Sequence, residues 1–132
     1  MFKSNSIWFW QRILTPHIAA LASELANRGF KVTFVANSLL SSARAKQGWE
    51  TPSLGKAKLI LARNKENVIS IASNAPIESI HICQGLRGNG LIKHTQKILR
   101  KRGLKYWVLM EMVDDEGVIG VIKRIIYNFL FL

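Results

Sequence analysis

Residues 6–37, SIWFWQRILTPHIAALASELANRGFKVTFVAN, have the pattern of a complete strand, loop, helix and strand. Residues 7–10 form a short run of β-branched and aromatic side chains, which is typical of a strand buried on both faces. Residues 31–36, KVTFVA, form a second run of this type. A strand, a helix and a strand this close together predict a right-handed crossover and a parallel sheet.

The helix between these two strands has a start signal and a stop signal. Thr15 has a side chain suited to the N-cap, and Pro16 is favoured at the first helical position because the N–H that it lacks would be unpaired there. Gly29 ends the helix, since glycine enters the left-handed conformation without steric penalty. Apolar side chains recur at helical spacing between these signals and predict one stripe, formed by Ile18, Leu21, Ala22, Leu25 and Ala26.

The rest of the chain continues the alternation of strands and helices. Residues 38–48 are expected to form a short helix or an irregular turn. The whole of residues 1–132 is predicted to form one α/β domain, a Rossmann-like three-layer structure with a mainly parallel sheet. Apolar runs predict strands at 58–62, 79–83 and 106–110, and helical spacing predicts helices at 64–74, 91–102 and 118–132.

The composition suits a globular domain with an anionic partner. The chain has 132 residues, of which 48% are hydrophobic, and a net charge of +11. This charge favours nucleic acid, a phosphate-bearing substrate or an acidic membrane surface, without choosing among them. A single cysteine, Cys83, excludes an internal disulfide framework and is expected to be a small core residue in a reducing compartment. With no signal peptide and no membrane span in the sequence, a cytoplasmic location is expected.

The basic run 97–105, KILRKRGLK, has two interpretations. Its cations, including Arg102, are expected to point outward from the helix 91–102. They are either a nucleic-acid patch or a set of cations at the end of a helix, where the helix dipole favours them. Because no exposed aromatic residues are interleaved with these cations, nucleic acid is the less favoured partner.

The first predicted strand leads into a candidate ligand site. Doubly wound sheets bind ligands at the carboxyl ends of their strands, and the loop 11–17 lies at such an end and at a helix N-terminus that favours anions. His17 is either an additional donor there or a solvated first-turn residue. The loop lacks the G-x-G-x-x-G pattern, so no nicotinamide or flavin cofactor is predicted.

The stretch 78–90, ESIHICQGLRGNG, supplies a second set of candidate residues. Gln84 and Gly85 begin a glycine-rich loop after the predicted strand, and glycine allows a ligand to approach the backbone closely. Arg87 either meets a phosphate or carboxylate or lies in solvent. His81, inside the strand, is predicted to be a hydrogen-bonded core histidine. The sequence has too few paired His, Cys and carboxylate positions for a metal site.

Glu111 is the candidate catalytic residue. It follows an apolar strand, where an ionised group is costly unless it lies at the exposed end or has a partner. A carboxylate at this end of a parallel strand is placed to hydrogen-bond a substrate hydroxyl or to act as a base. The acidic residues 114–116 are explained by ordinary charge placement before a helix.

Several of these stretches resemble one enzyme family. Residues 15–36, TPHIAALASELANRGFKVTFVA, resemble the opening of the GT-B-type glycosyltransferases, especially family four of the retaining sugar transferases. IHICQGLRG at 80–88 and MEMVDDEGVIGVIKRIIYNFLF at 110–131 are similar to the strand, cleft loop and acidic turn of bacterial capsule and exopolysaccharide transferases. Many members of family four have a histidine at the position of Glu111.

The resemblance implies that the chain is the first half of a GT-B fold. It would bind a glycan or lipid-linked acceptor in polysaccharide biosynthesis, while a C-terminal domain, expected to be missing here, would hold the nucleotide sugar. Cleft-lining roles are implied for His17, Gln84, Gly85 and Glu111, and the chain alone is expected to be inactive. The alternatives are a stand-alone Rossmann-like binding or regulatory module and a basic membrane or nucleic-acid adaptor.

The predicted last helix, 118–132, bears on the possible membrane partner. As a basic amphipathic helix it would lie on an anionic membrane, at the inner face of the cell membrane. Alternatively, it is a core helix that packs against a missing partner.

Overall fold

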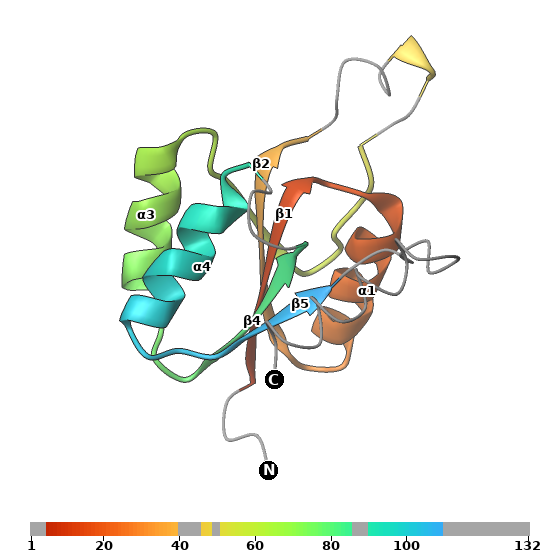
Figure 1. Ribbon diagram of the computed structural model, residues 1–132. Helices are drawn as coiled ribbons and strands as arrows, with labels where there is room; N and C mark the ends of the chain where they lie inside the picture. Colours follow the sequence, from red (N-terminus) through yellow and green to blue (C-terminus); the bar gives the residue numbers. More distant parts are fainter. Residues whose placement is uncertain (1–4, 40–45, 49–50, 86–89, 110–132) are drawn as a thin grey trace, which may run out of the picture.

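The structure is a computed structural model, which describes residues 5–39, 46–48, 51–85 and 90–109. They form a five-stranded parallel sheet with helices on both faces (Figure 1). The prediction of a Rossmann-like three-layer α/β domain is therefore confirmed. In chain order the elements are β1 (Ser6–Ile13), α1 (Pro16–Asn27), β2 (Lys31–Ser38), β3 (Lys58–Leu61), α3 (Lys65–Asn74), β4 (Ser79–Gln84), α4 (Ile92–Lys101) and β5 (Tyr106–Leu109).

The first strand lies in the middle of the sheet. The strand order is β3-β2-β1-β4-β5, so β1 pairs with β2 on one side and with β4 on the other. In Figure 1, α1 lies on one side of the sheet, while α3 and α4 lie side by side on the opposite side. Both faces of β1 are therefore covered by helices.

Successive side chains of β1 enter two different hydrophobic cores. Phe9 is fully buried in the core under α1, where its ring stacks on Phe34 of β2 at a centroid distance of 6.0 Å. Trp10 is buried in the core under α3 and α4. This alternation follows from the two-residue period of a strand. The second core also contains Val35, Ala62, Val68, Ala72, Cys83, Ile92 and Leu99.

The helix α1 packs on the sheet through small residues. Ala19, Ala22 and Ala26 are its buried residues, and their short side chains allow the helix to approach the strands closely. Leu21, which the predicted stripe included, is 42% exposed. Gly29 has a φ of +96° directly after the helix, which confirms the predicted stop signal.

The helices α3 and α4 are fixed at opposite ends by polar contacts. Asn64 caps α3, since its side-chain oxygen accepts a hydrogen bond of 2.8 Å from the backbone N–H of Asn67. At the end of α4, Nη1 of Arg102 donates a hydrogen bond of 2.7 Å to the backbone oxygen of Ala72 in α3. The expectation that Arg102 points outward is therefore wrong, because a free helix carbonyl binds it.

The boundaries of β1 differ from the prediction. The strand continues to Ile13, because Gln11 and Ile13 pair with Ala36 and Ser38 in the parallel ladder with β2. Gln11 therefore belongs to the strand and not to the loop after it. The predicted helix 118–132 and most of the predicted turn 38–48 lie outside the described residues.

The packing of Phe9 predicts a large effect on stability. Phe9→Ala is expected to lower the free energy of unfolding by about 3–5 kcal/mol, because it leaves a cavity between two layers. Leu21→Ala, at an exposed position, should lower it by less than about 1 kcal/mol. Urea unfolding followed by circular dichroism measures both. Equal losses in the two variants would contradict the packing, and Phe9→Leu serves if Phe9→Ala does not fold.

Candidate functional site

The topology places a switch point between β1 and β4. From β1 the chain passes through α1 to β2 on one side, whereas from β4 it passes through α4 to β5 on the other. The two helices lie on opposite faces of the sheet (Figure 1). In open parallel sheets, the crevice outside the carboxyl ends of two such strands is the usual ligand site. We refer to Gln11, Arg12, Gln84 and Gly85, at the ends of β1 and β4, as the carboxyl edge.

A side-chain hydrogen bond joins the two strand ends. The backbone N–H of Arg12 donates a hydrogen bond of 2.8 Å to Oε1 of Gln84. Gln84 is the last residue of β4 and is half-buried. Its side chain therefore joins the ends of β4 and β1, and the cleft-lining role of Gln84 stays a prediction.

Gly85 is held from two directions. It has a φ of +70°, and its backbone N–H donates a hydrogen bond of 3.1 Å to the oxygen of Leu109 in β5. Its own oxygen accepts a hydrogen bond of 3.1 Å from Nε2 of Gln96, a buried residue of α4. Gly85 therefore turns the chain away from the sheet in a fixed position. Sequence reasoning missed Gln96, although an amide among inward-facing apolar residues was a signal.

Gln11 has an unused donor. Its side chain is only 2% exposed, and Nε2 forms no hydrogen bond within the described part of the chain. By strand alternation Gln11 lies on the same face as Phe9, so its amide is on the α1 side of the sheet, near the start of that helix. A buried unpaired amide costs about 1–3 kcal/mol. A ligand acceptor at the carboxyl edge would satisfy it.

The start of α1 has the two residues that the sequence predicts for it. Thr15 occupies the N-cap position and Pro16 begins the helix, as predicted, but the Thr15 side chain forms no capping hydrogen bond. His17 is exposed in the first turn. The predicted site residues Arg87 and Glu111 lie outside the described residues.

Arg12 is a cation that sequence reasoning did not assign to the site. It is exposed near the end of β1, and a Cβ atom added to Gly90 would lie 3.6 Å from its Nε. The guanidinium therefore lies beside the residues that open α4. A charged residue near the end of a buried strand was the signal that could have identified it.

The described part of the carboxyl edge has hydrogen-bonding groups and positive charge but no carboxylate. Neither β1 nor β4, nor the four positions after either strand, contains Asp or Glu. Cys83 is fully buried, and burial raises the pKa of its thiol to about 12, so it is protonated at neutral pH and not a nucleophile. This confirms Cys83 as a core residue.

His81 is also a core residue, as predicted. It is fully buried, and its Nδ1 accepts a hydrogen bond of 3.0 Å from Nε1 of Trp10. The rings of Trp8 and Trp10 lie at centroid distances of 5.9 and 6.2 Å. Burial and, to a smaller extent, the positive charge of Arg102 lower the pKa of His81 from 6.5 to about 4. The imidazole is therefore neutral at pH 7.

Comparisons with protein-family models, curated proteins and solved structures find no match to this chain. In the described residues, no three His, Cys, Asp or Glu side chains gather where they could hold a metal ion. None of the helices in the described ranges has the length and apolar character needed to cross a membrane.

The pKa of His81 predicts acid sensitivity. Because the folded-state pKa lies below the unfolded value, the unfolded state binds more protons between pH 6.5 and pH 4, and stability falls as pH falls through this window. The contribution lost is about 3 kcal/mol. Urea unfolding at several pH values should show a flatter pH profile for His81→Gln than for the unmodified chain. Identical slopes would contradict the assignment.

Proposed function

We propose that this chain is the acceptor-side domain of a GT-B-type glycosyltransferase, and that a glycan or lipid-linked acceptor binds at the carboxyl edge. The observation that carries the proposal is a set of amide groups at the switch point between β1 and β4. Gln11 offers a buried unpaired N–H₂, and Gln84 is half-buried beside it in the neighbouring strand. Sugar hydroxyls both donate and accept hydrogen bonds, and amide side chains do the same.

The connection from β1 to α1 supports an acceptor over a dinucleotide. Its residues, Leu14 and Thr15, follow β1 directly and lead to Pro16. A dinucleotide site requires glycines here, so that the backbone can approach the pyrophosphate. Every residue of this connection has a side chain instead. The nucleotide sugar is therefore assigned, in this proposal, to a second Rossmann-like domain that faces the carboxyl edge.

The resemblance to family-four transferases extends the proposal to residues outside the described ranges. Glu111 follows Met110, next to β5, and would lie at the same end of the sheet as Gln84. There it would orient an acceptor hydroxyl or act as a base. Arg87, three residues after the end of β4 in the sequence, would contact an anionic group of the acceptor. The enzyme would work in the cytoplasm, at the inner face of the membrane that carries lipid-linked acceptors.

The proposal predicts selective saccharide binding by the isolated chain. In amide chemical-shift titrations, neutral oligosaccharides should shift the signals of Gln11, Arg12 and Gly85, whereas nucleotide sugars should leave them unchanged. No sugar transfer is expected from the chain alone, since the donor site belongs to the other domain.

A matched pair of amide truncations tests the site. Gln84→Ala removes the acceptor of the Arg12 N–H and should weaken saccharide binding about tenfold, the effect of one or two lost hydrogen bonds. Asn27→Ala truncates an exposed amide at the far end of α1 and should leave the dissociation constant unchanged. The proposal fails if no saccharide of the panel shifts the carboxyl edge, or if a dinucleotide does.

A further inference from the structure

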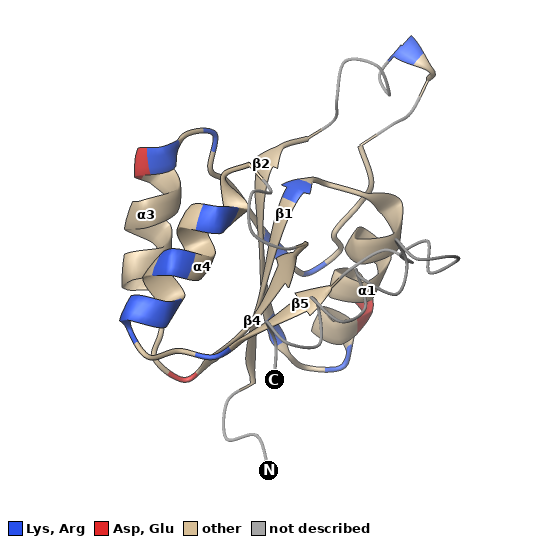
Figure 2. Ribbon diagram, viewed as in Figure 1, with Lys and Arg blue, Asp and Glu red and all other residues tan. Residues whose placement is uncertain are grey.

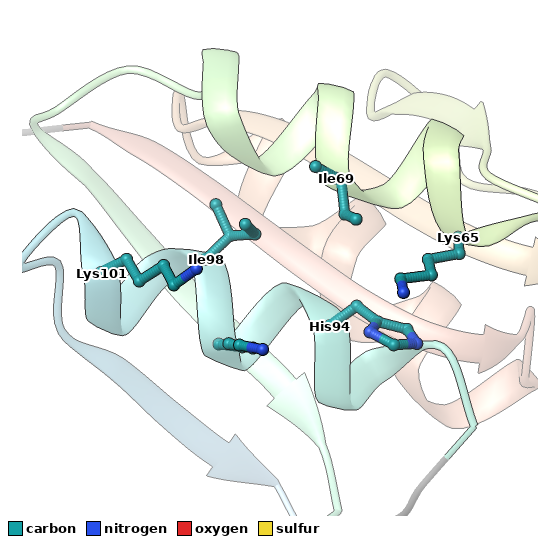
Figure 3. Close-up of a pocket in the computed structure, with 6 residues that line it drawn as sticks. Lys65, Ile69, His94, Ile98 and Lys101 are labelled. Carbon is teal, nitrogen blue, oxygen red and sulfur yellow. The ribbon is translucent and has the colours of Figure 1, made fainter.

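A basic groove separates α3 and α4 on the outer surface of the domain. The two helices lie side by side on one face of the sheet (Figure 1), and a cavity of about 200 Å³ opens between them. In Figure 3, Lys65 and His94 lie at one end of this cavity and Lys101 at the other. We call this cavity the α3–α4 groove; its lining residues are Lys65, Ile69, His94, Lys97, Ile98 and Lys101.

Helical spacing explains why these side chains share the groove. His94, Lys97 and Lys101 are three and four residues apart on α4 and therefore lie on one face. Lys65 and Ile69 are four residues apart on α3. The cations come from two helices that the Arg102–Ala72 hydrogen bond joins. The distance between the cations of α3 and those of α4 is therefore set by the fold.

The lysines of the groove have no carboxylate partner among the described residues. Lys65, Lys97 and Lys101 form no ion pair with any carboxylate in the described ranges, where Glu24 is paired with Arg28 on α1. Figure 2 shows Lys and Arg distributed along α4, and one basic and one acidic segment at the start of α3. Like charges at i, i+4 repel, and a bound anion would relieve this repulsion.

The pKa of His94 is sensitive to its surroundings. Partial burial and the positive charges of Lys65, Lys93 and Lys97 lower the pKa of its imidazole from the ordinary 6.5. Lys65 belongs to α3, and the other two lysines belong to the same helix as His94. An anion in the groove would reverse the shift, because it favours the imidazolium.

We propose that the α3–α4 groove is a binding site for a phosphate ester or diphosphate, carried by a small molecule or by a lipid headgroup. Three lysines and a histidine supply donors for a dianion, and Ile69 and Ile98 supply an apolar wall for its organic part. The volume is below the roughly 300–1,000 Å³ of sites for drug-sized ligands, so a compact group fits. None of the described residues that line the groove is Phe, Tyr or Trp, which disfavours extended base stacking of single-stranded nucleic acid.

This site is separate from the carboxyl edge. Gln96 reaches Gly85 from the sheet-facing side of α4, whereas Lys97 and Lys101 are exposed on the outer side. The inference therefore stands whether or not the chain binds a sugar acceptor.

Pyrophosphate is the probe for the first experiment. At low ionic strength it should shift the amide signals of Lys65, His94 and Lys97, and calorimetry should give a dissociation constant for the folded chain. The double variant Lys97→Gln/Lys101→Gln should weaken binding about tenfold or more, since charge-assisted hydrogen bonds are lost. Glutamine keeps a similar helix propensity.

The control has the same change in net charge. Lys31→Gln/Lys56→Gln removes two exposed cations outside the groove and should alter the dissociation constant less than twofold. Equal weakening in the two double variants, or pyrophosphate-induced shifts spread over the whole surface, would overturn the proposal, because binding would then follow net charge alone.

Vesicles distinguish the two sources of the phosphate group. Phosphatidylcholine vesicles containing phosphatidic acid should bind the chain and compete with pyrophosphate if the ligand is a lipid headgroup. If the source is a soluble phosphate ester, pyrophosphate binds and these vesicles do not. The site would be overturned if the chain bound phosphatidic acid and phosphatidylserine vesicles equally well and Lys97→Gln/Lys101→Gln left this binding unchanged.

A pH series with sulfate tests whether His94 contributes to binding. Sulfate keeps its charge over this pH range, so any pH dependence comes from the protein. The affinity for sulfate should rise as the pH falls below 6.5, because the bound dianion favours the imidazolium against Lys65, Lys93 and Lys97. His94→Gln should remove most of this dependence, because glutamine has no proton to gain in this pH range. A pH dependence that persists in His94→Gln would remove His94 from the site.

Discussion

Burial of β1 on both faces is the constraint from which the rest of the architecture follows. Phe9 and Trp10 are adjacent, yet each is completely buried in a different core. Both faces of the sheet must therefore be covered, which α1 does on one side and α3 with α4 on the other. A chain that covers both faces from one central strand reverses its direction of winding beside that strand. The switch point between β1 and β4, and with it the carboxyl edge, results from this reversal.

Local sequence pattern was enough to find the elements and their order along the chain. Strand and helix periods, Pro16, Gly29 and the apolar run of β4 each act within a few residues, so they can be recognised without knowing the fold. What the pattern could not supply was the neighbour of each element. Gln11 was placed in a loop because it breaks an apolar run, but its pairing with Ala36 keeps it in the strand.

The errors at Leu21 and Arg102 have the same origin. A helical stripe shows which face is apolar, but its width in the core depends on how closely the helix approaches the sheet. The alanines of α1 bring it close, and Leu21 falls outside the contact. Arg102 looked like a solvated cation until α3 placed the carbonyl of Ala72 within 2.7 Å. At the candidate site, local pattern was enough to place Gln84 and Gly85 at the end of a strand, whereas the positions of Gln96 and Arg12 depend on tertiary structure.

The helix α4 serves two chemically different surfaces, and its geometry keeps them apart. Consecutive residues of a helix point about 100° apart, so Gln96 and Lys97 face in different directions although they are neighbours in sequence. Gln96 is buried against Gly85 and supports the uncharged amides of the carboxyl edge. Lys97 adds charge to a groove with no carboxylate among its lining residues. Water screens the lysine charge at the surface, whereas the hydrogen bond of Gln96 is shielded from solvent. A substitution in the groove therefore changes the surface potential and leaves the frame of the sheet edge in place.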